Sequence, residues 1–499
     1  MADKIIHSRL FPCIYMPLLF IAACLSNFFE AEIYGGAFFL LVTAAMLVLS
    51  SDLVDAMLPA LFLAVSVTKL YNILANEVWK QQLYDIGWVL IPLLAAVIFH
   101  FAYYRKPIRI GPSFWGLCAI SVALLLGGVG TISSAEYFAP AALFYTLGLG
   151  VGMVAFYLLV KSHLSDTAGK TVAISLYLIG LYAGFCVIMF YVRDMAGHSR
   201  FLESGNETVR SLAAYLYSGS ASNNLFLTRH QFLYFQSSNN LSTFLMLAMP
   251  FPLYWAAKNP AHILSVVFMY ICLVFSGSRG GLVMGTIELL LLMIAYIVIF
   301  PRNRRQRIVA SCATAVLCIS FIACIPIVIS LFQMPVSSDE AAVGISGLWE
   351  KLRTYMLNSD EPRLKLMKQM VYDFIKNPAF GVGIGYTGNE NLYNPVTGAM
   401  NWYHMWFAQI IGGLGALGIA AYGFQLVDRV RIFLRNRSRL TWAMFLSYIG
   451  LFLMSQVNPG EFCPVPYAML AVTFFAIMEQ KMPVPSHATQ ANATTLSPQ

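Results

Sequence analysis

Charged residues are scarce in this chain, making up 11% of its 499 residues, whereas 59% are hydrophobic. A single soluble core cannot hide that much apolar surface, so the composition excludes an ordinary soluble globular protein. Apolar runs of the ~20 residues that cross a bilayer as a helix recur along nearly the whole chain. Because a backbone in lipid must satisfy its hydrogen bonds within its own segment, we expect these runs to be helical.

Two kinds of site also lack their sequence signals. The nine cysteines include no CxxC pair, and none belongs to a Cys/His cluster at zinc spacing, so we expect neither a disulfide framework nor a bound metal. The net charge of +8 comes from short basic clusters between apolar runs. Such clusters are typical of topology signals, and we expect no nucleic-acid partner.

The apolar runs predict an all-α, polytopic integral membrane protein of about 12–14 transmembrane helices, with a large extracytoplasmic loop that contains an amphipathic helix. The spans are placed near residues 11–28, 33–50, 53–75, 84–102, 113–131, 140–160, 171–192, 240–257, 261–277, 280–300, 308–331, 402–426, 440–457 and 463–480. The chain then divides into N-terminal transmembrane helices (1–192), an extracytoplasmic segment (193–239), transmembrane helices with a Ser-Arg-Gly-Gly turn (240–331), the large extracytoplasmic loop (332–401), C-terminal transmembrane helices (402–480) and a disordered cytoplasmic tail (481–499).

Basic connectors predict the orientation. Short loops rich in Lys and Arg stay in the cytoplasm, and with these spans the basic connectors all fall on one side; they carry Arg105, Lys106 and Arg109, then Arg302, Arg304, Arg305 and Arg307, then Arg429, Arg431, Arg435, Arg437 and Arg439. Segments 193–239 and 332–401 fall on the other side. Lys4 and Arg9 ahead of the first apolar run fit a first span or a cleaved signal peptide, and either leaves the remaining topology unchanged.

Arg279 is a charge inside an otherwise apolar stretch, residues 272–284. The span count places it at an extracytoplasmic turn between small residues, which let a backbone or a ligand approach closely and leave the guanidinium accessible. The alternative is that Arg279 has no binding role and only extends its charged group to the membrane interface.

The large loop contains a second arginine in a favourable place. Ser359 or Asp360 can cap a helix with Pro362 at an early position, so Arg363 falls in a first turn, where the helix dipole favours an anion. The alternative is a solvated surface arginine beside Asp360 and Glu361. The apolar stripe of this helix predicts that it lies on the membrane or against the spans; it comprises Leu364, Met367, Val371, Phe374 and Ile375.

Two features follow that helix. The Gly381-x-Gly383-x-Gly385 run lacks the Lys-Ser/Thr of a phosphate loop, and we interpret it as a flexible helix exit. His404 opens the next span at its outer boundary. A neutral imidazole can take the proton of a hydroxyl nucleophile, and arginines suit a pyrophosphate. The alternative for a single interfacial histidine is a structural role.

These features together resemble the O-antigen ligase and Wzy-type polysaccharide polymerase superfamily. The resemblance rests on the Ser-Arg-Gly-Gly turn, the loop with Arg363, the Asn-Pro-Ala-Phe-Gly-Val-Gly-Ile-Gly stretch at 377–385, and the His404 helix running into Gly412-Gly-Leu-Gly-Ala-Leu-Gly418. It covers roughly 220–426, and rests on general membrane architecture before that.

The resemblance implies a metal-independent glycosyltransferase without a cofactor, which acts in the bacterial plasma (inner) membrane with its active site on the extracytoplasmic side. Its partners would be the lipid bilayer, a polyprenyl-diphosphate-linked glycan donor and a sugar-hydroxyl acceptor. By the same resemblance, Arg279 and Arg363 hold the diphosphate and His404 activates the acceptor, with Arg229 and Asn240 as further substrate contacts. Arg353 is an alternative to Arg363, and Met405 stands where the family usually has asparagine.

Three questions stay open at this level. Ligase and polymerase share these motifs, and the acceptor is not specified by them. A transporter or flippase of lipid-linked glycans or another solute is the alternative function, with Glu288 as its buried acid. A third possible function is a nonenzymatic membrane anchor, although an anchor would not need the basic and histidine groups on the outer side.

Overall fold

The computed structural model describes residues 5–6, 10–28, 32–66, 87–131, 146–196, 203, 205–211, 238–276, 278–301, 304–312, 314–315, 362–384, 393–394, 399–400, 403–458, 460–462 and 464–480. The proposed contacts Arg229 and Arg353, and the tail at 481–499, lie outside these residues. The side chains of Arg279 and Arg363 are not described either, although both residues lie in described helices.

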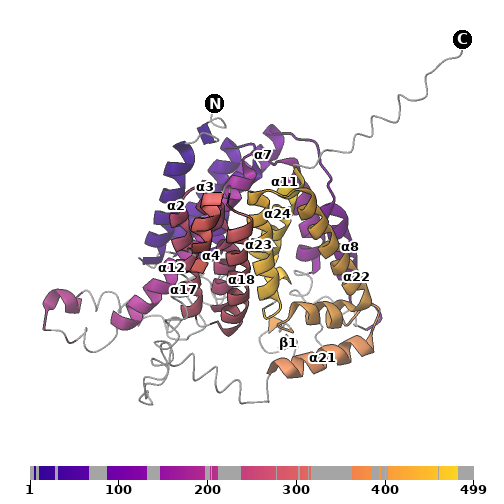
Figure 1. Cartoon of the computed structure of the whole chain (residues 1–499). Helices are drawn as coiled ribbons and strands as arrows, with labels where there is room; N and C mark the ends of the chain where they lie inside the picture. Colours follow the sequence, from indigo (N-terminus) through magenta and orange to yellow (C-terminus); the bar gives the residue numbers. More distant parts are fainter. Residues whose placement is uncertain are drawn as a thin grey trace, which may run out of the picture.

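The described part of the chain is helical except for one short ladder, and this confirms the predicted all-α membrane fold (Figure 1). The helices are α2 (Leu10–Phe28), α3 (Glu32–Leu49), η1 (Leu53–Ala56), α4 (Met57–Ser66), η2 (Gly87–Val89), α7 (Leu90–Tyr103), α8 (Ser113–Leu126), η3 (Gly148–Gly152), α11 (Met153–Ser162), α12 (Ala168–Ala196), α15 (Ser238–Ala248), α16 (Pro250–Ala256), η4 (Pro260–His262), α17 (Ile263–Phe275), α18 (Arg279–Val298), α21 (Pro362–Lys376), α22 (Trp406–Arg435), α23 (Arg439–Ser455), η5 (Gly460–Phe462), η6 (Pro464–Ala468) and α24 (Met469–Gln480). The ladder joins β1 (Tyr393–Asn394) and β2 (Ala399–Met400) as an antiparallel pair.

Several helices have the length and composition of membrane spans. Among the described residues, three helices are long and apolar enough to cross a bilayer, and these comprise Ala168–Met189, Gly280–Val298 and Trp406–Arg435. Shorter apolar helices stand beside them, in the regions where the sequence predicts further spans. The protein is therefore a polytopic membrane protein.

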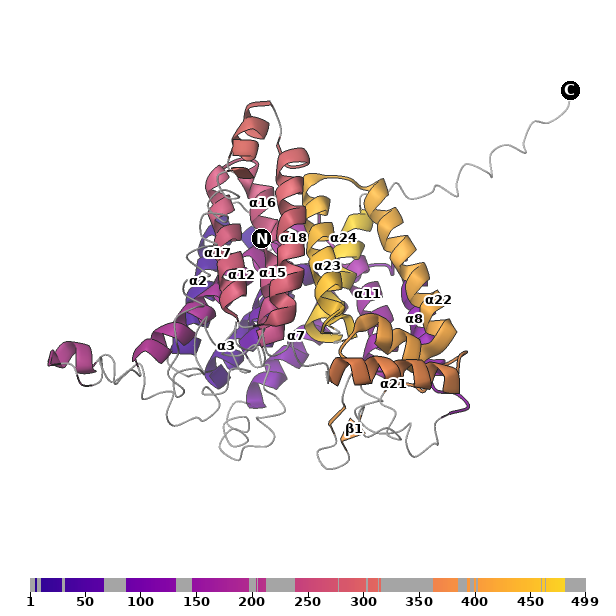
Figure 2. The same cartoon turned by 60° about the horizontal axis from the view of Figure 1, so that its bottom comes forward.

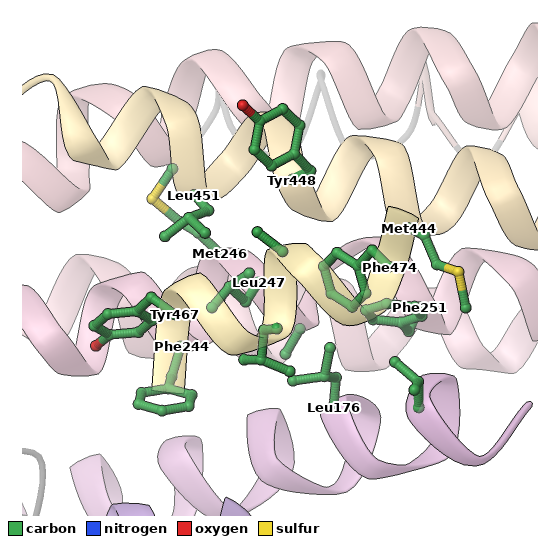
Figure 3. Packing of buried hydrophobic residues seen from close by; sticks show 14 of the residues in the cluster. Leu176, Phe244, Met246, Leu247, Phe251, Met444, Tyr448, Leu451, Tyr467 and Phe474 are labelled. Carbon is green, nitrogen blue, oxygen red and sulfur yellow. The ribbon is translucent and has the colours of Figure 1, made fainter. Parts of the chain in front are cut away.

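Helix α15 is surrounded by other helices of the bundle, among them α12, α17, α18 and α23. All eight residues from Leu241 to Ala248 are buried, as expected for a helix surrounded by protein on every side. Figure 3 shows its Phe244, Met246 and Leu247 among side chains of α12, α16, α23 and α24. The Ser447 hydroxyl of α23 donates to the Leu247 carbonyl at 2.6 Å. Close packing of this kind gives the helices that end near the candidate site a rigid support.

The basic connectors meet at one end of the bundle, which we call the basic end. The side chain of Lys106 donates to the Ser51 carbonyl at 3.0 Å. Similar bonds run from Gln306 to the Ala257 carbonyl, 2.8 Å, and from Arg439 to the Pro301 carbonyl, 3.1 Å. Segments that the topology prediction placed on one side of the membrane are thus hydrogen-bonded to one another. At the opposite end, which we call the loop end, α21 lies across the ends of the upright helices (Figures 1 and 2).

Arg429 is an exception to the predicted connectors, and its assignment to the short connector after the span at 402–426 was wrong. Helix α22 continues to Arg435, so Arg429 still lies inside the bundle. Its Nη1 donates to Glu461 Oε1 at 2.6 Å and to the Tyr448 hydroxyl at 2.5 Å, and all three side chains are buried. Glu461 comes from η5, 32 residues later in the chain. An ion pair between segments this far apart leaves no local pattern in the sequence.

Candidate active site at the loop end

The Ser-Arg-Gly-Gly turn forms the start of α18. Ser278 is the N-cap, and its hydroxyl accepts from the Gly281 N–H at 2.9 Å while donating to Asn239 Oδ1 at 2.6 Å. Ser276 is hydrogen-bonded to Ser242 of α15, Oγ to Oγ 2.8 Å. The turn is therefore joined to the first two turns of α15 by paired polar side chains, which orient the backbone of α18 at its first residue, Arg279.

The glycines of this turn serve helix packing. A Cβ added to Gly281 would lie 2.5 Å from Ser242 Cβ, and one added to Gly280 would lie 2.7 Å from Val457 Cγ2 after the end of α23. The atoms that approach these glycines belong to side chains of α15 and of the segment after α23, rather than to a backbone. Because the other end of α18 meets Arg439 through Pro301, Arg279 begins the helix at the loop end.

Helix α21 carries Arg363 as its second residue and packs on the beginning of α22. Among its described side chains, Met370 and Asp373 are buried, whereas Met367, Val371 and Ile375 of the predicted apolar stripe are exposed. The helix lies against the spans with the face that carries Met370 and Asp373, and these exposed apolar residues are available to lie on the membrane, the other position that the sequence predicts. Asp373 can be buried because the Tyr403 hydroxyl supplies a hydrogen-bond partner for its carboxylate.

The glycine run after α21 has an ordered structural role, so the expected flexible helix exit is wrong for its described part. The N–H groups of Val382 and Gly383 donate to the carbonyls of Gly412 and Gly413, at 3.0 and 2.8 Å. These bonds lie just before Gly415, where α22 is interrupted by a non-helical residue with φ 62° and ψ −154°.

The same connection supplies hydrogen-bond acceptors for the first N–H groups in the second half of α22. The N–H groups of Ala416 and Leu417 donate to the carbonyls of Pro378 and Ala379, at 2.8 and 3.1 Å. These are donors that a helix start leaves without intrahelical partners. We call residues 378–383 and 412–417 the glycine clasp. Its backbone bonds fix α21 to α22 and set the direction of the short first half of α22, which begins directly after the turn that carries His404.

A prediction concerns the break in this clasp. Gly415→Ala should lower the free energy of unfolding by about 1–3 kcal/mol through backbone strain alone, because its φ and ψ lie in a region that is essentially restricted to glycine. The cost should be greater still, since the added Cβ would lie 2.6 Å from the Gly381 nitrogen and 2.7 Å from the Pro378 carbonyl oxygen. Thermal unfolding in detergent measures this change. Gly423→Ala is the matched control in the same helix, because its Cβ would meet nothing within 4 Å; an equal loss of stability in both variants would contradict the role given to the clasp.

His404 lies in a strained and exposed position. It is exposed to solvent, and it is the one non-glycine residue with positive φ, 56°, in the described part of the chain. The residues on either side are buried, with Tyr403 1% and Met405 7% exposed. Backbone strain of this kind persists only where the surroundings enforce it, and it is frequent at functional sites. The turn thus holds an imidazole at the surface between two buried anchors.

The described contacts join the elements that carry the sequence-predicted groups, and none of these contacts is between those groups themselves. Arg279 and Asn240 belong to helix starts that are joined through Ser278 and Asn239. Arg363 belongs to α21, which packs through Met370 and Asp373 on the turn that carries His404. Sequence reasoning missed the contacts of Asn239 and Asp373. The doubled Asn239-Asn240 and the i, i+4 spacing of Gln369 and Asp373 were the available signals.

Comparison with known proteins identifies this region. No curated protein matches the chain. A family model does match, the one described as O-antigen ligase, over residues 264–423. The matched interval includes the start of α18, all of α21, His404 and the broken part of α22. Residues 264–423 of this membrane protein therefore form an O-antigen ligase domain, which confirms the resemblance found in the sequence.

Proposed function

We propose that this protein is a membrane glycosyltransferase of the O-antigen ligase or polymerase type, acting in cell-surface polysaccharide biosynthesis. Its donor is a glycan linked to polyprenyl diphosphate, and its acceptor is a sugar hydroxyl. The loop end faces the extracytoplasmic side of the bacterial inner membrane, in agreement with the positive-inside rule applied to the basic end. The observation that supports the proposal most is His404, exposed on a strained turn within the matched residues.

The chemistry is a substitution at the anomeric carbon. His404 accepts the proton of the acceptor hydroxyl through a ring nitrogen, and the oxygen forms a bond to the anomeric carbon. The bond between that carbon and the phosphate oxygen breaks, and polyprenyl diphosphate leaves with the electron pair. The guanidinium groups of Arg279 and Arg363 bind the diphosphate and stabilise the charge that develops on it. Direct displacement inverts the anomeric configuration.

The diphosphate assignment is tested by Arg279→Ala in purified protein. The guanidinium binds the diphosphate of the donor, and this contact does not involve the acceptor. For this reason the donor KM should rise roughly 10- to 100-fold, the effect expected for losing a hydrogen bond between charged groups. Initial rates at varied donor concentration measure it, with Arg437→Ala, an exposed arginine beyond the other end of α22, as the control. An unchanged donor KM in Arg279→Ala would remove this residue from the donor site.

The products test the function itself. Purified protein given a polyprenyl-diphosphate-linked glycan and a distinct acceptor should release polyprenyl diphosphate and form a glycosidic bond. One transfer per acceptor identifies a ligase, and a ladder of repeats identifies a polymerase. Failure to form any glycosidic product with competent donor and acceptor would contradict the proposal.

Transport of lipid-linked glycans is the second candidate, and one observation favours it. Glu288 of α18 is 1% exposed, and neither carboxylate oxygen has a hydrogen-bond partner in the described part of the chain. Ionisable groups inside a membrane often mark transport pathways. Movement of a labelled lipid-linked glycan across vesicles, without a glycosidic product, would favour this function over transfer.

A further inference from the structure

Tyr403 joins helix α21 to the turn that presents His404. Its hydroxyl donates to Asp373 Oδ2, and the other oxygen of that carboxylate accepts from Gln369 Nε2 at 2.8 Å. Asp373 and Tyr403 are each 1% exposed. Burial raises the pKa of Asp373 above its ordinary value, while the bonds from Tyr403 and Gln369 oppose that rise. Both acceptor atoms of the carboxylate are used, so the arrangement is a complete buried network.

Two further contacts fix the tyrosine. Its backbone N–H donates to Gln409 Oε1 at 3.3 Å. Its ring lies against Gly412 in the glycine clasp, where an added Cβ would come within 2.7 Å of the hydroxyl oxygen. Tyr403 is therefore held from α21, from the first half of α22 and from the clasp, while the next residue along the chain is the exposed His404.

The strained turn depends on this anchoring. A left-handed backbone at a non-glycine residue costs free energy, and the turn retains it only while its neighbours on both sides are held. On one side, Met405 is buried among Met370, Tyr403 and Ala408. On the other side, the hydroxyl of Tyr403 provides the side-chain bond to α21. Loss of that bond removes a side-chain connection between the turn and α21.

We propose that Asp373, acting through Tyr403, is a positioning residue that aims the imidazole of His404 and sets its place relative to α21, the helix that carries Arg363. The inference rests on the proposed function, because His404 is the group to be positioned. Neither Asp373 nor Tyr403 touches the reacting atoms. Their hydrogen bond acts on the geometry of the base, and so on the rate of the chemical step.

The test is Tyr403→Phe, which removes the hydroxyl and keeps the ring. We expect kcat to fall about 10- to 100-fold, the effect of a small misplacement of a catalytic group, with the donor KM unchanged because the diphosphate contacts remain. Asp373→Leu should act in the same way, because it removes the acceptor of the Tyr403 hydroxyl. Asp373→Asn should keep most of the kcat, since its amide oxygen accepts from Tyr403 while its NH2 group donates to the amide oxygen of Gln369 once that side chain amide turns over.

Tyr157→Phe is the matched control. Tyr157 is fully buried and donates to the Glu479 carboxylate at 2.6 Å on α24, away from the loop end. The Tyr157→Phe substitution removes the same kind of hydrogen bond, so it should lower the free energy of unfolding without lowering kcat. Wild-type kcat in Tyr403→Phe, or an equal loss of kcat in Tyr157→Phe, would overturn the inference. So would an Asp373→Asn variant as slow as Asp373→Leu, provided that it folds as well as Asp373→Leu.

A second readout does not depend on transfer. The rate at which diethyl pyrocarbonate modifies His404, followed by mass spectrometry of its peptide, should change in Tyr403→Phe and not in Tyr157→Phe. If the wild-type protein forms no glycosidic product, the proposed function fails while this labelling still reports on the link from Asp373 to His404. An unchanged labelling rate in Tyr403→Phe would overturn the link itself.

Discussion

Replacing His404 should reduce glycosyl transfer by about 100- to 10,000-fold, the usual contribution of a general base. His404→Asn is a better variant than His404→Ala, because asparagine tolerates the left-handed backbone that His404 adopts at φ 56°. The asparagine variant therefore removes the base without adding strain to the turn. The measurement is the initial rate of glycosidic product formation at saturating donor and acceptor.

Two further measurements accompany this experiment: donor binding by the His404→Asn variant, and transfer by a variant of another histidine. Binding of the lipid-diphosphate donor should persist in His404→Asn, since the proposed diphosphate contacts are Arg279 and Arg363. His262→Asn is the control, because His262 lies in η4, beside the basic end, and its ring nitrogen is hydrogen-bonded to Tyr177 at 2.9 Å. Wild-type transfer rates in His404→Asn would reject its role as the base, and loss of donor binding would show that it acts on the donor instead.

Removing Arg429 should produce the largest loss of stability. Arg429→Met leaves the Glu461 carboxylate buried without its partner at 2.6 Å, and breaking a buried ion pair in this way costs about 3–5 kcal/mol. The free energy of unfolding should fall by that amount, with a marked drop in Tm in detergent. The double variant Arg429→Met with Glu461→Gln should recover much of the loss, because no uncompensated charge then remains inside the bundle.

Arg431→Met is the matched control for this prediction. Arg431 stands two residues further along α22, its side chain is 64% exposed, and its ion pair with Asp428 is longer, at 3.7 Å. The Asp428 side chain is 13% exposed, but the Arg431 end of the pair is in solvent and the separation is long, so we expect a contribution of about 0–1 kcal/mol, as for surface pairs, and a much smaller shift of the unfolding transition than in Arg429→Met. A small effect of Arg429→Met, or no recovery in the double variant, would show that the buried pair does not hold η5 against α22.

The helices, and the gathering of their basic connectors at one end, were predicted from local patterns. A run of about 20 apolar residues predicts a span wherever it occurs, and each basic connector is recognised from residues that are adjacent in the chain. For this reason the sequence placed α17, α18 and α23 to within a few residues. The start of α18 was equally accessible, because serine before a helix and glycine within its first turn are adjacent in the chain.

The errors all involve partners distant in sequence. Arg429 was assigned to a basic connector because Glu461, which neutralises it, comes from another segment. The contact that buries Asp373 of α21 was not predicted because its partner Tyr403 lies 30 residues later in the chain. Gly415 reads as one more small residue in an apolar run until the backbone of residues 378–383 is seen to pass beside it.

The sequence by itself determined that this protein is a polytopic helical membrane protein and which end of each helix carries the basic connectors, and its motifs resemble those of O-antigen ligases. Composition and local order decide the helical membrane architecture, since each span satisfies its own backbone bonds in lipid. Only the tertiary structure decided how His404 is held at the surface, which face α21 buries and where α22 breaks. Those features depend on hydrogen bonds and backbone contacts between segments that become neighbours only when the chain is folded.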